Sequence, residues 1–175
     1  MVAKKKSSRK AKKPVPKKTL LKKPPKISTT TKLIYIDSCL FFPSQSVAGY
    51  SDNFQDGRNT VLPGLSLLAP LALPVNSIIK SITVYYKNTT NEDMQCMLLK
   101  KHIDHHAYSG EVEVTIDTLP PATLAPDNYV AKLIDHFDSG GLVKDKYMYY
   151  VEIDNTGKVS ETELRTLRGI RVEYL

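Results

Sequence analysis

The residues with the clearest capacity for chemistry are the lysines at the start of the chain. Residues 1–32 hold 13 of the 25 Lys and Arg residues and no Asp or Glu, so the rest of the chain has a formal net charge of −6 within a total of +7. Clustered lysines neutralise phosphates without reading base sequence, and they also bind acidic protein surfaces. We therefore predict that nucleic acid or an acidic partner binds Lys4, Lys5, Lys6, Arg9, Lys10, Lys12, Lys13, Lys17, Lys18, Lys22, Lys23 and Lys26.

The same segment has a composition that opposes folding. It carries Pro14, Pro16, Pro24 and Pro25, which block helix propagation, and its like charges repel one another. We predict a disordered or extended arm over residues 1–31 and a folded domain over residues 32–175. A nuclear localisation signal and a purely solubilising tail stay open as alternative roles for the arm.

One short cluster has the residue types of a metal site. Alternation along a strand would place His102, Asp104 and His106 on one side, where a transition metal would accept them as ligands. A polar strand end that runs into the Tyr108-Ser109-Gly110 turn explains the same residues more simply. We expect no metal and no other cofactor, and we keep these three residues as candidates.

Patterns for catalysis are missing from the sequence. There is no Gly-x-Ser-x-Gly elbow and no phosphate-binding GxxxxGK[ST] or GxGxxG loop, and the carboxylates are scattered. Cys39 and Cys96 lie in apolar runs, which favours reduced, buried side chains. We therefore expect no catalytic residues and a protein that is not an enzyme.

β-Strand patterns dominate from residue 32 onward. Ile78–Tyr86 alternates and should turn Ile78, Ile82, Val84 and Tyr86 toward a core, and Met94–Ile103 returns as its hairpin partner. Further strands are predicted over residues 32–42, 66–73, 110–117, 129–137, 146–154 and 167–175. Seven or eight strands without a helical period predict an all-β fold, a single antiparallel β-sandwich of jelly-roll type.

Ten tyrosines and no tryptophan are present. Neighbours along a strand point to opposite faces, so the pairs Tyr85-Tyr86 and Tyr149-Tyr150 each require one semi-exposed face. Carbohydrate-binding sandwiches present aromatic residues in this way, and subunit interfaces do so as well. The apolar run Val61–Ile79 is interrupted by prolines, so we expect no membrane span, and we expect no signal peptide.

Two resemblances bear on function. The stretches Leu68–Asn88 and Leu167–Tyr174 resemble uncharacterised β-sandwich modules of bacterial and phage chains. The order of basic arm, neutral hinge and jelly roll resembles small virion proteins. That resemblance implies a coat, minor capsid or capsid-decorating protein, located in the virion. It further implies a homo-oligomer, with a trimer as one option, that contacts other capsid subunits and packaged nucleic acid.

Our leading hypothesis from the sequence is thus a structural virion protein whose arm binds nucleic acid or acidic neighbouring subunits. Two alternatives from other classes stay open. One is a ligand-binding β-sandwich of the carbohydrate-binding type, and the other is a nuclear or nucleoid-associated binding protein.

Overall fold

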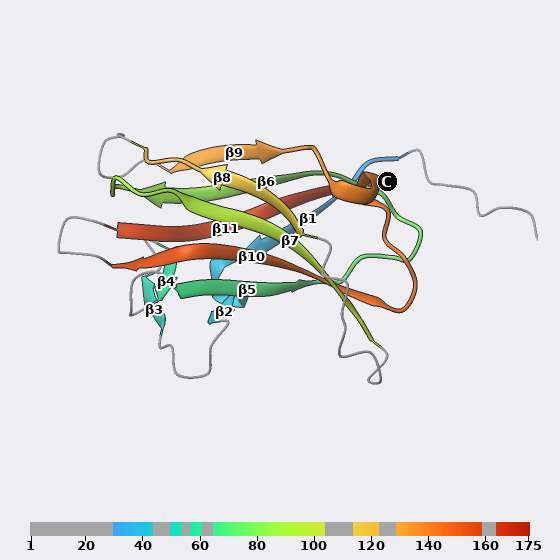
Figure 1. Cartoon of the computed structure of the whole chain (residues 1–175), viewed down its shortest axis with the longest axis horizontal. Helices are drawn as coiled ribbons and strands as arrows, with labels where there is room; N and C mark the ends of the chain where they lie inside the picture. Colours follow the sequence, from blue (N-terminus) through green and yellow to red (C-terminus); the bar gives the residue numbers. More distant parts are fainter. Residues whose placement is uncertain are drawn as a thin grey trace, which may run out of the picture.

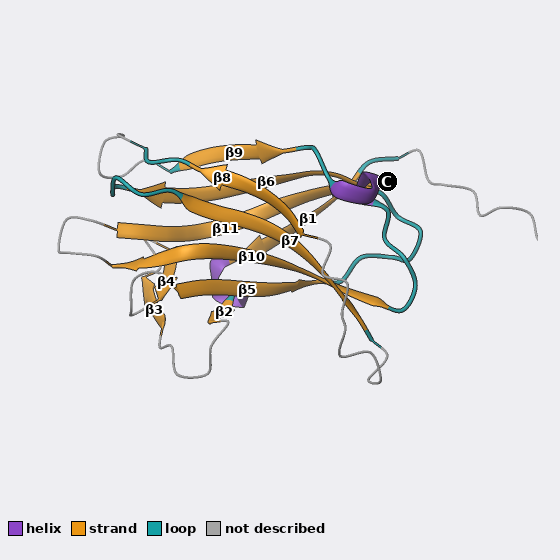
Figure 2. Cartoon of the chain, in the orientation of Figure 1, coloured by secondary structure: helices purple, strands orange, loops and turns teal. Residues whose placement is uncertain are grey.

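The computed structural model describes residues 30–43, 50–53, 57–60, 65–103, 114–122, 129–158 and 164–175, and the structural statements below concern these residues. They form eleven β-strands arranged in two layers (Figure 1). The only helical segments in these ranges are two short 3-10 turns, η1 (Ser38–Leu40) and η2 (Asp138–Gly141) (Figure 2). None of the described helical segments has the length and hydrophobicity needed to cross a membrane.

The first layer, which we call sheet A, is antiparallel throughout. Its strands lie in the order β9 (Val130–Ile134), β6 (Ile79–Asn88), β11 (Leu164–Tyr174) and β1 (Lys32–Asp37). The short β4 (Gly57–Thr60) pairs with β11 beside β1, and β3 (Tyr50–Asn53) pairs with β4.

The second layer, sheet B, is antiparallel as well. Its order is β8 (Val114–Leu119), β7 (Met94–His102), β10 (Tyr147–Lys158), β5 (Leu65–Leu71) and β2 (Phe42–Pro43). The end of β10 pairs with the start of β11, Gly157 opposite Arg165, and so joins the two layers.

The core lies between the sheets and follows from alternation along the strands. Ile82 and Val84 of β6 are opposite Val172 and Ile170 of β11, and all four side chains are buried. Sheet B contributes buried side chains from β5, β7 and β10 in the same way. Burial of each large apolar side chain contributes roughly 1.5–3 kcal/mol, so this layer of side chains holds the sandwich closed.

The predicted all-β sandwich is confirmed, and its strand details need four corrections. Residues 32–42 break at Asp37 into β1, η1 and β2, and Cys39 in that break is exposed, not buried. The predicted turn at Asn155–Gly157 lies within β10, which continues to Lys158 through a bulge, with Asn155 at φ 60°. The extra strands beyond the predicted number are the short β2, β3 and β4.

The fourth correction concerns the start of β6. Ile79 is buried there and Ile78 is only half-buried, because the pairing of β6 with β11 shifts register between Glu173 and Tyr174. The strict alternation that predicted Ile78 as a core residue therefore holds only from Ile82 onward.

Glycines set the spacing of sheet A. A Cβ atom at Gly57 would lie 2.2 Å from the carbonyl oxygen of Leu167, and one at Gly141 would lie 2.4 Å from that of Ile79. Both glycines have positive φ, +79° and +70°, a conformation that other residues adopt only with strain. These two close approaches fix β4 and η2 against β11 and β6.

Candidate functional site

The outer face of sheet A carries rows of polar and aromatic side chains together with the exposed Leu33 and Leu133. The strand register places Tyr35, Arg171, Thr83 and Leu133 in one row across four strands. The next row, toward the start of β11, holds Asp37, Gly169, Tyr85 and Ala131. The row toward the end of β11 holds Leu33, Glu173 and Ser81. We name the group Tyr35, Asp37, Thr83, Tyr85, Arg171 and Glu173 the polar–aromatic face.

The two tyrosines of this face differ in exposure. Tyr35 is 66 % exposed on β1, and Tyr85 is half-buried on β6. They are two strands and two residues apart, which corresponds to about 12 Å in a β-sheet. The face thus offers two aromatic rings on a rigid backbone with polar groups between them.

Arg171 lies at the centre of the face. Its Nη2 is 3.1 Å from Oε1 of Glu173 and donates a 3.4 Å hydrogen bond to Oγ1 of Thr83. Its Nε is buried and has no hydrogen-bond partner among the described residues. The Arg171 side chain as a whole is 31 % exposed, so the exposed part of its guanidinium, not the buried Nε, is the part that suits a ligand hydroxyl or carboxylate.

Asp37 closes the face at the end of β1. Its Oδ1 accepts a 3.0 Å hydrogen bond from the backbone N–H of Cys39, where it caps η1, and a 3.4 Å one from Oγ of Ser38. The bond from the Cys39 N–H is the main reason that the pKa of Asp37 lies below its ordinary value. The carboxylate is therefore ionised at neutral pH.

The outer face of sheet B has a different composition. We name its group Phe42, Met97, Leu99, Ile116, Met148 and Tyr150 the apolar face. Phe42 is 55 % and Ile116 is 53 % exposed, and Glu152 stands among these side chains between Met97 and Leu68.

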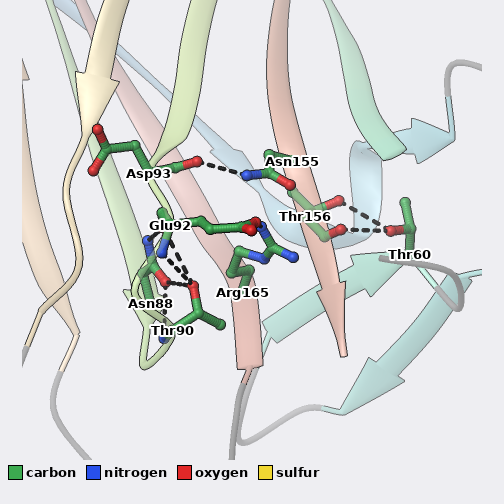
Figure 3. A network of polar contacts seen from close by, with 8 residues as sticks. All are labelled: Thr60, Asn88, Thr90, Glu92, Asp93, Asn155, Thr156 and Arg165. Atoms are coloured by element: carbon green, nitrogen blue, oxygen red, sulfur yellow. Dashed lines mark hydrogen bonds and ion pairs between the residues drawn. The ribbon is translucent and has the colours of Figure 1, made fainter. Parts of the chain in front are cut away.

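A polar network closes the end of the sandwich where β6 turns into β7 (Figure 3). Arg165 of β11 is buried, and its Nη1 donates a 2.7 Å hydrogen bond to Oε2 of Glu92 in that turn. Asn88 holds the turn through Thr90 and the carbonyl of Glu92, and Asn155 of β10 donates to the carbonyl of Asp93. These bonds tie the turn to β10 and β11, so we assign the network to the scaffold.

The structure places few of the residues that the sequence proposed for binding. All twelve basic residues from Lys4 to Lys26 lie outside the described residues, and so do Asp104 and His106. His102 ends β7, and its ring meets that of Tyr147 edge-on at 4.9 Å, beside the buried Lys100. No group of three or more metal-ligating side chains occurs in the described part of the chain.

The polar–aromatic face was missed at the sequence level, although a signal was present. In the sequence KLIYID, Ile34 and Ile36 alternate with Leu33, Tyr35 and Asp37, and Arg171 and Glu173 alternate with Ile170 and Val172. Both patterns mark an outward row, but only the pairing of β1 with β11 brings the two rows together.

Comparison with known proteins identifies the fold. No family model matches the chain, and no curated protein matches it. Several solved structures share the fold, and some of them are described as carbohydrate-binding modules.

Two of these structures are similar over most of the chain. The carbohydrate-binding module CBM35 of Abf62 from Cellvibrio japonicus is 14 % identical, covers 81 % of this chain and 92 % of its own, with a TM-score of 0.50. The xylan-binding module CBM15 is 13 % identical, covers 82 % of this chain and 97 % of its own, also with a TM-score of 0.50. At such identities the likeness establishes the jelly-roll type of fold.

These findings correct the leading hypothesis. The expectation of a structural virion protein is wrong, because the structures that share this fold are carbohydrate-binding modules and none of those named is a capsid protein. The same comparison gives no support to capsid assembly or nucleic-acid binding. The nucleoid alternative and the role of the arm stay untested predictions.

Proposed function

We propose that this protein is a non-catalytic carbohydrate-binding module that binds an oligosaccharide across the polar–aromatic face. The observation that carries this proposal is Tyr35, which is 66 % exposed and lies in one strand row with Arg171 and Thr83. A tyrosine ring provides an apolar surface for the C–H face of a sugar, while its hydroxyl stays in water. Such a large exposed ring beside charged donors has no role in the core.

The polar groups of the face suit the hydroxyls of a sugar. Arg171 supplies N–H donors, and Glu173 and Asp37 supply carboxylate acceptors, while the buried Thr83 hydroxyl accepts from Arg171 and holds it in place. Tyr85 lies about 12 Å from Tyr35, which favours a chain of more than one sugar ring. The fold, shared with carbohydrate-binding modules, supports the same class of ligand.

The spacing of the carboxylates argues against hydrolysis on this face. Asp37 is opposite Gly169, four residues from Glu173 along β11, so the two carboxylates are separated by about 14 Å. The two carboxylates of a glycoside hydrolase lie about 5–9.5 Å apart. We therefore expect binding without cleavage of the sugar.

Calorimetric titration of the full chain with neutral oligosaccharides, xylo-oligosaccharides included, tests the proposal. We expect binding that Tyr35→Ala weakens roughly tenfold or more, as loss of a central aromatic contact does. Phe42→Ala is the matched control, because Phe42 is a similarly exposed aromatic residue on sheet B. Absence of binding to every sugar, or equal losses in the two variants, would overturn the proposal.

A further inference from the structure

The apolar face of sheet B has the composition of a protein interface. It is enriched in methionine, aromatic and branched aliphatic side chains, which are the types that protein contacts favour. Three of these side chains are about half-exposed, Phe42 at 55 %, Ile116 at 53 % and Met148 at 45 %. A contiguous apolar surface of this kind marks an interaction site in a soluble protein.

The face extends over most of sheet B. It spans β8, β7, β10 and β5, and Phe42 of the two-residue β2 continues it beyond β5. The aliphatic side chains offer few ring surfaces or hydrogen bonds for a sugar.

Charges mark the two ends of the face with opposite signs. Lys101 lies in register with Met148 at one end, and Asp154 lies in register with Gln95 at the other. In the rows between them, Tyr150 pairs with Leu99 and Glu152 pairs with Met97. Glu152 has no ion pair or side-chain hydrogen bond with another described residue, so a partner that covers this face must supply a donor to it.

We propose that the apolar face binds the same face of a second copy of this chain, around a two-fold axis that runs across the strands. This operation places the strands of the two sheets B antiparallel and sets the end row of Lys101 over the end row of Asp154. It also places Glu152 of each copy opposite Tyr150 of the other copy, so this contact occurs twice in the dimer. Opposite charges then lie in facing rows, one strand apart, at both ends, and each Glu152 carboxylate faces the row of a Tyr150 hydroxyl donor.

Tyr150 adds a second reason for this pairing. Among the described residues of one chain its hydroxyl donates only to the sulfur of Met148, at 3.4 Å, which is a weak acceptor. A Glu152 carboxylate from the second copy is a stronger acceptor. The face is therefore complementary to itself in charge and in hydrogen bonding, as a two-fold interface requires.

Sedimentation velocity of the full chain over a range of concentrations tests the pairing. We expect a monomer–dimer equilibrium. Met148→Glu should weaken dimerisation at least about tenfold, because it places a new carboxylate in the row that faces Asp154 of the other copy. Leu133→Glu is the matched control, since Leu133 is a similarly exposed apolar residue on the outer face of sheet A, and it should leave the dimer unchanged.

The charge layout gives a second test that does not depend on loss of folding. Lys101→Glu and Asp154→Lys should each weaken the dimer, and the double variant should restore it, because it exchanges the two signs. Circular dichroism checks that every variant is folded. A monomer at all concentrations, a trimer, equal effects of Met148→Glu and Leu133→Glu, or failure of the double variant to recover would overturn the proposal. None of these outcomes depends on whether a sugar binds.

Discussion

The outer faces of the two sheets are built by the same alternation, yet they carry different chemistry. On sheet A the outward residues include Tyr35, Arg171 and Glu173, so charged groups lie beside aromatic rings, with Leu33 and Leu133 at the margins. On sheet B they include Met97, Met148 and Ile116, so aliphatic groups surround one central carboxylate. The inward residues are constrained by the core, whereas the outward residues reveal what each face contacts. A sugar stays hydrated and needs hydrogen bonds, and a protein partner excludes water and needs apolar area.

The two sheets also differ in how their backbones are held. The close glycine contacts at Gly57 and Gly141 involve carbonyl groups of sheet A, in β11 and β6. These contacts leave those strands little freedom. Both sheets are also packed through large buried side chains, such as Leu67, Met94 and Ile153 in sheet B and Ile82, Tyr86 and Val172 in sheet A. The sheet with these additional backbone contacts is the one on which we place a ligand that needs fixed geometry.

The largest effect is expected at Gly141. A Cβ there would lie 2.4 Å from the Ile79 carbonyl oxygen, so Gly141→Ala must displace η2 from β6. We expect the free energy of unfolding, measured by urea denaturation, to fall by about 3 kcal/mol or more. Gly140→Ala is the control: it has φ +66° but nothing within 4 Å of its Cβ position. It should cost only about 1–2 kcal/mol, the strain of a left-handed residue.

Arg171 gives the next largest effect and sharpens the contrast between the faces. We expect Arg171→Ala to weaken oligosaccharide binding by about 1.5–3 kcal/mol, the contribution of hydrogen bonds to a charged group. Arg171→Lys should recover part of this loss, because lysine keeps the charge but not the planar donors. Lys101→Ala on sheet B should leave sugar affinity unchanged in the same calorimetric titration. Equal losses from Arg171→Ala and Lys101→Ala would mean that neither face is specific.

The fold could be predicted from the sequence because local patterns determine it. Ile82, Val84 and Tyr86 alternate with polar residues, and a turn leads to Met94, so the β6–β7 hairpin is evident. The pairs Tyr85-Tyr86 and Tyr149-Tyr150 were predicted to have one semi-exposed member each. The structure confirms this, with Tyr86 and Tyr149 buried and Tyr85 and Tyr150 half-buried.

The site could not be predicted, because it depends on pairing between distant segments. Tyr35 and Arg171 are far apart in sequence and become neighbours only when β1 pairs with β11. Alternation identifies the two sides of one strand but does not determine which strands lie side by side. The many lysines of the arm drew attention to residues 1–31, whereas the described surface offers its candidate site on sheet A.

A smaller effect is expected where the edges of the two sheets meet. Lys132 of β9 is 3.6 Å from Asp117 of β8, and the Asp117 side chain is 15 % exposed. We expect a double-mutant cycle with Lys132→Met and Asp117→Asn to give a coupling energy of about 0.5–1 kcal/mol in thermal unfolding. High salt should reduce that coupling, because Lys132 is partly solvated. A coupling energy of zero would mean that side-chain packing alone holds these edges together.

The smallest effect concerns Asp37 at the border of the polar–aromatic face. Its pKa is lowered from 3.8 in the folded chain, chiefly by the hydrogen bond from the Cys39 N–H, so ionised Asp37 stabilises the fold. This stabilisation is fully present above pH 3.8, and it is lost as the pH falls through the lowered pKa of the folded state. Asp37→Asn keeps a capping side chain but does not titrate. In thermal melts at a series of pH values, wild type should exceed Asp37→Asn slightly at neutral pH and converge with it in strong acid. A difference that grew on acidification would contradict this sign, and with it the assignment of Asp37 as an anionic group on the sugar-binding face.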